Sequence, residues 1–313
     1  MTTAPLLRIG TRGSPLALAQ TEEVRARLVA AHPELGTADA VQVMVIKTTG
    51  DKVVDRPLAD VGGKGLFTKE IDEAMLAGRI DLAVHSMKDL PTWLPDGIAL
   101  ACTLEREDPR DVFISSKAES IAGLPEGAVI GSASLRRQAQ ILHRRPDLRV
   151  VLFRGNIHTR LRKVEDGEVD ATLLAMAGLK RLGLTHAVTA VIEPEELLPA
   201  VGQGAIGVTC RTGDRRTREL LAPLDHAVTW ARVTAERAML EVLDGSCRTP
   251  IAGLAEVAAG GTLTLRGLIA RPDGTELIEC ARHGAAADAD AIGRDAGGEL
   301  LGRAGPGFFD SSG

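Results

Sequence analysis

The sequence predicts an α/β protein with two doubly wound lobes and a smaller C-terminal part of three strands with helices. Short apolar runs alternate with segments of helical periodicity through residues 6–103, a pattern typical of a parallel sheet covered by helices. The same alternation starts again at residue 112 and continues to residue 175. From residue 251 onward, three strand-like runs precede one helical stretch.

The first lobe is expected to contain strands at 6–11, 41–48, 81–85 and 98–103. Ser14 should cap a helix that has Pro15 at its first position. A second helix over about 68–77 should stop at Gly78. Residues 49–65, which lie between the strand at 41–48 and this second helix, are polar and rich in glycine. A connection of this length within a compact domain is usually functional or mobile.

The segment 105–111 is polar and interrupted by proline, and is expected to cross into the second lobe. That lobe should contain strands at 112–115, 129–131, 150–153 and 171–175, with helices starting at Ser134 and Asn156. Residues 193–199 resemble a second crossing, and the strand at 205–210 is expected to return to the first lobe.

The C-terminal part starts with a long helix that Asp225 should cap, followed by strands at 251–257, 263–270 and 276–282 and a helix from about residue 286. The domain boundaries predicted from these elements are 1–104 with 200–219 for domain 1, 105–199 for domain 2, and 220–313 for domain 3.

Composition is that of an ordinary soluble protein, with 44% hydrophobic and 25% charged residues in 313. Neither a signal-peptide pattern nor an apolar run of membrane-spanning length occurs, so a cytoplasmic protein is expected. The four cysteines form no CxxC pair and the seven histidines show no metal-ligand spacing, which predicts no metal site.

Positive charge is concentrated between Ser134 and Lys163, where nine cations accompany one acid in a protein of net charge −5. Arg136 and Arg137 follow a helix cap, Arg154 follows a strand, and Arg160 lies on the next helix. Cations at strand ends and helix starts converge on one rim of an α/β sheet, where anions bind. The alternative is a solvated basic face, which is the expectation for Arg144, Arg145 and Arg149.

The motif HSMKDLP at 85–91 lies at the end of a predicted strand. Lys88 and Asp89 could form a surface ion pair in a turn. If the turn instead faces a cleft lined by arginines, Asp89 stays ionised and can stabilise a cationic intermediate and transfer protons.

Cys247, in LDGSCRTP, follows a helix and a Gly–Ser turn, and Arg248 next to it favours its thiolate. It is therefore a candidate nucleophile or attachment point. Cys102, Cys210 and Cys280 lie on strand-like runs and are expected to be buried apolar residues.

Two glycine-rich motifs do not indicate nucleotide binding. GQGAIG at 202–207 precedes a strand instead of linking a strand to a helix, and VGGKGLF at 61–67 lacks the P-loop spacing, although its Lys64 could bind an anion. A nucleic-acid binder is disfavoured by the net charge and by the absence of tyrosine. A solute-binding protein of two lobes would explain the arginines but not Cys247.

Nine motifs occur in the order found in the porphobilinogen deaminase family, which the chain resembles from about residue 6 to 300: TRGSPLALAQ, GDKVVDRPLADVGGKGLF, DLAVHSMKDLP, EREDPRD, GSASLRRQ, FRGNIHTRL, AGLKRLGL, LPAVGQGAIGV and DGSCRTP. The resemblance implies three domains, the first two similar to the lobes of type-2 periplasmic binding proteins. It implies a monomeric cytoplasmic transferase of haem biosynthesis that joins four porphobilinogen molecules head to tail, releases ammonia, and hydrolytically releases the tetrapyrrole.

The family's cofactor is a dipyrromethane primer made from the substrate, which the resemblance places on Cys247 through a thioether. Asp89 matches the catalytic aspartate. A chain of up to six rings carries twelve carboxylates, which is the polyanion that the arginines require. The primer-binding residues implied are Lys88, Ser134, Arg136, Arg137, Arg154 and Arg160. The substrate-binding residues implied are Arg12, Ser14, Lys64, Arg154, Arg160, Arg181 and Gln203.

The chain departs from the commonest family pattern at three positions: Asp60, Ser246 and Arg248. Asp60 removes a cation that some relatives carry. Ser246 replaces a glycine and Arg248 follows the cysteine, so the loop conformation around Cys247 is the feature most affected. No nucleic-acid or membrane partner is expected.

Overall fold

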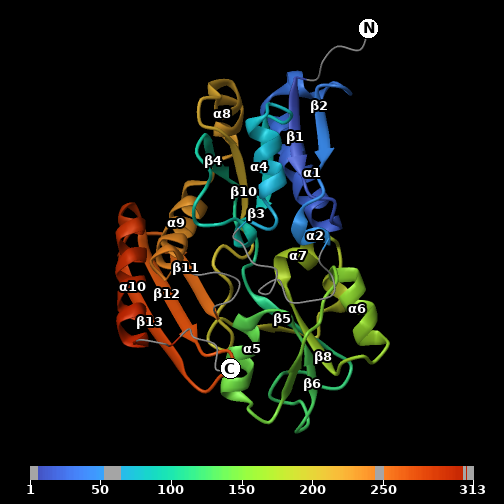
Figure 1. The fold of residues 1–313 in the computed structure, drawn as a ribbon, viewed down its shortest axis with the longest axis vertical. Helices are drawn as coiled ribbons and strands as arrows, with labels where there is room; N and C mark the ends of the chain where they lie inside the picture. The colour runs from blue at the N-terminus through green and yellow to red at the C-terminus, as the bar shows by residue number, and fades with distance from the viewer. Residues whose placement is uncertain (1–5, 53–64, 244–249, 306–307, 309–313) are drawn as a thin grey trace. The chain divides into compact units, whose positions relative to one another are not determined.

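The computed structural model describes residues 6–52, 65–243, 250–305 and 308. The chain forms two compact units. Among the described residues, the first unit comprises 6–52, 65–107 and 205–230, and the second comprises 108–204, 231–243, 250–305 and 308. Figure 1 shows their helices and strands.

The first unit contains a five-stranded sheet in the order β2-β1-β3-β10-β4. Its strands are β1 (Leu7–Thr11), β2 (Val41–Val45), β3 (Leu82–Ser86), β4 (Ile98–Thr103) and β10 (Ile206–Arg211). Strand β10 runs antiparallel to both β3 and β4. The run at 205–210 therefore does return to the first sheet, as the sequence predicted.

Helices cover both faces of this sheet because its strands alternate apolar side chains between two cores. Leu7 and Ile9 pack with Val24 and Leu28 of α1 (Pro15–Ala31). On the other face, Ala83 packs with apolar residues of α4 (Lys69–Leu76). The unit's other helices are α2 (Thr49–Lys52), α8 (Arg215–Leu221) and the 3₁₀ turns η1 (Pro33–Gly36), η2 (Met87–Asp89) and η4 (Ala222–Leu224).

The second unit contains a sheet with the same topology, in the order β7-β6-β8-β5-β9. Its strands are β5 (Asp111–Ser115), β6 (Val129–Gly131), β7 (Arg149–Val151), β8 (Ala171–Ala175) and β9 (Ala190–Ile192). In each sheet, the strand that follows a chain crossing, β5 or β10, is inserted antiparallel between two others. One face packs against α5 (Leu135–Arg144), the other against α6 (Ile157–Glu165) and α7 (Met176–Arg181).

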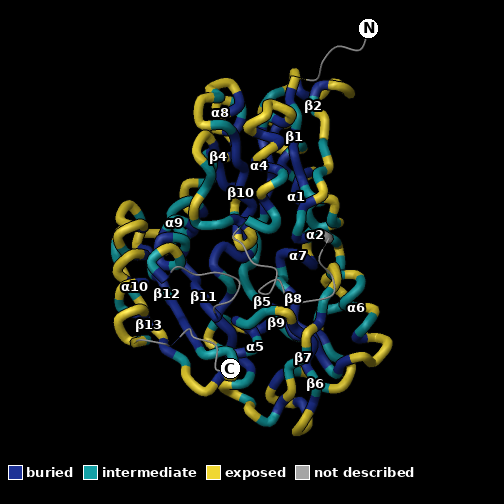
Figure 2. Tube along the Cα trace, viewed as in Figure 1, coloured by how far each residue is buried: buried dark blue, intermediate teal, exposed yellow. Residues whose placement is uncertain are grey.

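A third sheet, also in the second unit, is an antiparallel meander of β11 (Ile251–Val257), β12 (Thr262–Ala270) and β13 (Leu277–Ala285). One face packs against α9 (Ala227–Val242) and α10 (Ala289–Ala304). The other face packs with Ala139 of α5, so α5 is buried between two sheets. Figure 2 shows the burial of these strands. The remaining 3₁₀ turns are η3 (Thr185–Ala187) and η5 (Ala286–Asp288).

The predicted α/β class, with two doubly wound lobes and a small three-stranded C-terminal part, is confirmed. The predicted cap of α9 is wrong, because Asp225 accepts a hydrogen bond from the Thr103 N–H and His226 Nδ1 accepts the Thr229 N–H instead. Sequence reasoning also missed α7, α8 and β9, which are short. Within the described ranges, none of the helices has the length and apolarity needed to cross a membrane.

Gly274, in the β12–β13 turn, lies directly against α5. His143 Nδ1 donates to the Gly274 carbonyl at 2.9 Å, and Gln138 Nε2 donates to the Pro272 carbonyl at 3.1 Å. Gly274 has φ +74°, and a Cβ there would lie 2.5 Å from the backbone nitrogen of His143. This turn therefore requires glycine for both its conformation and its close approach to α5.

We predict that Gly274→Ala lowers the free energy of unfolding by about 2–4 kcal/mol, because it combines left-handed strain with backbone overlap. Gly127→Ala is the matched control: φ is +75° but no atom lies within 4 Å of the new Cβ, so the loss should be about 1 kcal/mol. Urea denaturation of both variants measures the difference. Equal losses would show that contact with α5 contributes nothing.

Candidate functional site

The turn that carries Asp89 is anchored to the first sheet. Strand β3 leads directly into η2 (Met87–Asp89), and the Met87 side chain is buried. The Met87 N–H donates to the Ala205 carbonyl at 3.0 Å, and the Leu90 N–H donates to the Met87 carbonyl at 3.2 Å. Lys88 and Asp89 are exposed on this turn. The backbone therefore holds the Asp89 carboxylate, 37% exposed, at a fixed place.

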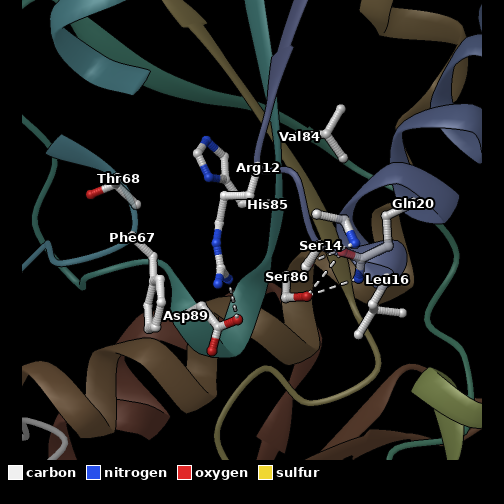
Figure 3. A pocket seen from close by; sticks show the side chains of 11 residues that line it. Arg12, Ser14, Leu16, Gln20, Phe67, Thr68, Val84, His85, Ser86 and Asp89 are labelled. Carbon is white, nitrogen blue, oxygen red and sulfur yellow. Dashed lines mark hydrogen bonds and ion pairs between the residues drawn. The ribbon is translucent and has the colours of Figure 1, made fainter. Parts of the chain in front are cut away.

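A pocket in the first unit lies beside this turn (Figure 3). It is lined by Arg12, Ser14, Leu16, Ala17, Gln20, Phe67, Thr68, Val84, His85, Ser86 and Asp89. Ser14 caps α1 as predicted, accepting the Ala17 N–H at 3.2 Å. Gln20 and Ser86 hydrogen-bond each other across the pocket wall. The pocket thus combines a carboxylate, a guanidinium and several neutral polar groups.

Arg12 connects Asp89 to a second acid. Its Nη1 lies 3.9 Å from Asp89 Oδ2, while its Nε donates to Asp51 Oδ1 at 3.1 Å. Its guanidinium also lies over the Phe67 ring, 3.9 Å from the centroid. Burial alone would raise the pKa of Asp51, but hydrogen bonds from Arg12 and Thr48 hold it below its ordinary value. Arg12 is therefore held in place by a partner that remains charged.

His85 lies behind Arg12 and is buried. Its Nε2 lies 3.0 Å from Thr209 Oγ1. Burial, with a smaller contribution from the nearby Arg12 charge, lowers the pKa of His85 from 6.5 to about 4. The imidazole is consequently neutral near pH 7 and adds no charge to the pocket.

In the second unit, Arg136 and Arg137 lie in the first turn of α5, whose cap is Ser134 as predicted. Both guanidinium groups pair with the buried Asp111, through Arg136 Nη2 at 2.8 Å and Arg137 Nη2 at 2.7 Å. Gln203 Nε2 donates to the same carboxylate at 2.9 Å. Three of the predicted binding residues therefore converge on one acid that sequence reasoning did not single out.

Arg160 completes an arginine cluster that consists of Arg136, Arg137, Arg154 and Arg160. Burial first, and then the charges of Arg137 and Arg154, lower the pKa of Arg160 to about 10. Its Nε donates to the Gly155 carbonyl at 3.0 Å. Burial is the larger cause, and the added contribution of the neighbouring charges shows that Arg137, Arg154 and Arg160 lie close together. Asp111 pairs with two guanidinium groups, so its single charge does not balance both.

Arg181 Nη2 donates to the Gly204 carbonyl at 3.2 Å, next to Gln203. Arg144 and Arg149 are exposed, as expected. The expectation for Arg145 is wrong: its side chain donates to the carbonyls of Ile121, Ala122 and Leu124 and pairs with Asp147.

Two family models match this chain. The porphobilinogen deaminase dipyromethane cofactor binding domain matches residues 7–219, and the C-terminal domain of porphobilinogen deaminase matches residues 230–302. The chain belongs to the porphobilinogen deaminase family. The chloroplastic porphobilinogen deaminase of Pisum sativum is 59% identical over 98% of this chain and 84% of its own length. Porphobilinogen deaminase of Paracoccus denitrificans is 59% identical over 98% of this chain and 97% of its own length.

Among solved structures, the periplasmic aliphatic sulphonate binding protein SsuA from Escherichia coli has a TM-score of 0.41 and 14% identity, over 79% of this chain and 73% of that chain.

A porphobilinogen deaminase uses a dipyrromethane, and the arginine cluster fits the carboxylates that this group carries. The Arg137 Nε is buried and has no hydrogen-bond partner within the described ranges. Excess positive charge and an unpaired donor are both satisfied by an anion. Cys247 and Lys64 lie outside the described residues, as do Asp60, Ser246 and Arg248. Cys102, Cys210 and Cys280 are buried, as predicted, and burial raises the pKa of Cys102 to about 12.

Two buried groups in the first unit should give opposite pH dependences of stability. Protonating His85 below pH 6.5 favours the unfolded state, because the folded state binds that proton only near pH 4. Burial raises the pKa of Asp72 from 3.8 to about 6, so protonation of Asp72 favours the folded state as pH falls through 6. Each shift corresponds to about 3 kcal/mol.

We predict that the free energy of unfolding of His85→Gln rises by about 2–3 kcal/mol relative to that of the wild type when the pH falls from 7 to 4.5, because the destabilising protonation of His85 is removed. Asp72→Asn is the matched variant and should lose a comparable amount over that interval. Urea denaturation at the two pH values measures both. A His85→Gln protein with the wild-type pH dependence would contradict this assignment.

Proposed function

We propose that this chain joins four porphobilinogen molecules head to tail, releasing ammonia at each addition, and then releases hydroxymethylbilane by hydrolysis. The observation that carries the proposal is the position of Asp89 in a member of this family. Its carboxylate lies on a turn hydrogen-bonded to the sheet, in a pocket and 3.9 Å from Arg12.

Asp89 is proposed as the catalytic residue. Loss of ammonia from porphobilinogen leaves a cationic pyrrole, and a carboxylate beside the ring nitrogen stabilises that charge by accepting its N–H. Because the interaction strengthens as positive charge develops, it lowers the barrier rather than only binding the substrate. The one-third exposure of Asp89 also lets it accept the proton that the coupled pyrrole carbon loses and pass that proton to solvent.

Arg12 and Ser14 are proposed to bind the substrate's carboxylates, together with Lys64, Arg154, Arg160, Arg181 and Gln203. This role is best supported for Arg12, because Asp51 and Phe67 contact its guanidinium from two sides and hold it in place. A guanidinium that is already oriented loses little entropy when it binds a carboxylate. Its Nη1 faces Asp89, so a substrate held there has its reacting ring near the catalytic acid.

The primer is proposed to be attached to Cys247 and held by Lys88, Ser134, Arg136, Arg137, Arg154 and Arg160. When bound, the dipyrromethane supplies the pyrrole carbon that each incoming substrate alkylates. The burial of the other three cysteines supports Cys247 as the attachment point, because a thiol must be accessible and able to ionise to react.

We also propose a division into three domains, comprising residues 1–104 with 200–219, residues 105–199, and residues 220–313. Each of these regions contains all the described strands of one sheet. A cytoplasmic monomer that binds neither nucleic acid nor membranes remains part of the proposal. The net charge of −5 and the low aromatic content of 2% support the absence of a nucleic-acid partner.

We predict that Asp89→Asn lowers kcat for porphobilinogen consumption by about 10²–10⁴-fold, the range expected for loss of an acid–base group, with little change in unfolding midpoint. Asp96→Asn is the control, because Asp96 is an exposed aspartate in the connection that follows the same turn. Consumption is followed by colour development with Ehrlich's reagent. A wild-type rate in Asp89→Asn would remove Asp89 from the mechanism, and absence of turnover in the wild type would reject the function.

A further inference from the structure

Asp111 occupies an unusual position for an acid. It is the first residue of β5, a strand that lies between β8 and β9, and its side chain is 0% exposed. A carboxylate is rarely buried unless its charge is compensated by cations and hydrogen bonds. The cations and hydrogen-bond donors around Asp111 must therefore compensate its buried charge.

Donors from two separate segments meet on this carboxylate. Oδ2 accepts from Arg136 Nη2 at 2.8 Å. Oδ1 accepts from Arg137 Nη2 at 2.7 Å and from Gln203 Nε2 at 2.9 Å. The two arginines come from α5, whereas Gln203 comes from the turn that precedes β10.

Each of these three side chains is also fixed by a backbone carbonyl. Arg136 Nη1 donates to Leu198 at 2.7 Å, Arg137 Nη1 donates to Leu173 at 2.8 Å, and Gln203 Nε2 donates to Pro109 at 2.7 Å. The groups are thus oriented by the protein before any ligand binds. The Arg137 Nε is the buried atom of this set without a partner in the described part of the chain.

The charges of this group do not cancel. Two guanidinium groups share one carboxylate, and Arg160 lies close enough to Arg137 for their charges to interact. Burial alone would raise the pKa of Asp111, but Arg136 and Arg137 hold it well below its ordinary value. Asp111 therefore stays ionised, allows two arginines to be buried side by side, and leaves net positive charge for an anion.

We infer that Asp111 is a positioning residue for ligand binding: from a position closed to solvent, and held itself by Gln203, it orients Arg136 and Arg137 toward the carboxylates of the primer and substrate. This inference rests on the proposed function. A carboxylate with no exposed surface does not touch these ligands, so its effect on them passes through the two guanidinium groups. Its removal should weaken binding rather than slow the chemistry.

The test measures how fast primer-free protein acquires its primer. Protein prepared without primer is incubated with a range of porphobilinogen concentrations. Intact-mass spectrometry then measures the fraction of protein whose mass has risen by two units, where one unit is the mass of porphobilinogen minus that of ammonia. The variants are Asp111→Asn, which keeps the shape and removes the charge, and Asp111→Glu, which keeps the charge and displaces it. Asp147→Asn is the matched control, because Asp147 pairs with Arg145 just beyond the C-terminal end of α5.

In each folded Asp111 variant, the porphobilinogen concentration that gives half-maximal primer acquisition should rise at least tenfold. The kcat of those molecules that have acquired the primer should change less than threefold. Asp147→Asn should load like the wild type. A purely structural role would lower the thermal midpoint without moving the half-saturating concentration, and that result overturns the inference. So does a comparable rise in Asp147→Asn, or failure of both Asp111 variants to fold. If the wild type itself gains no mass, the proposed function fails instead.

Discussion

The buried ion pairs of Asp111 with Arg136 and Arg137 are the interaction on which the proposed binding site of the second unit depends. Burying a guanidinium is costly unless a carboxylate and hydrogen bonds compensate it. Here one carboxylate compensates two guanidinium groups, and the remaining charge is increased by Arg160. The excess positive charge is tolerated because α5, which carries both arginines, packs on one side against the second sheet and on the other against the C-terminal sheet. On the proposed function, an anionic ligand would bind guanidinium groups that folding has already desolvated.

The repeated sheet topology explains where the functional side chains lie. In the first sheet, Arg12 follows β1 and the Asp89 turn follows β3. In the second sheet, the start of α5 follows β6, and Arg154 follows β7. All four strands are parallel members of their sheets. Ligands of open α/β sheets bind at the carboxyl ends of such strands. One topology therefore provides a carboxylate-bearing turn in one unit and an arginine cluster in the other.

Local sequence was sufficient for much of the fold and for the placement of the candidate residues. The helix caps Ser14 and Ser134 were predicted because capping depends on neighbouring residues only. Asp89 was placed correctly at the end of a strand. The partners of the cations were not predictable, since Asp51 lies 39 residues from Arg12 and Asp111 lies 25 residues from Arg136. Counting charges within one window also gave Arg145 a solvated role, although the backbone carbonyls that it binds lie about two dozen residues earlier.

If this cationic site binds a covalently attached oligopyrrole, mass spectrometry and peptide mapping of the natively purified protein should detect it. The protein mass should exceed the sequence mass by two porphobilinogen units less two molecules of ammonia, and fragmentation should assign the addition to the Cys247 sulfur. A catalytically active protein with an unmodified Cys247, or with the addition on another residue, would contradict it.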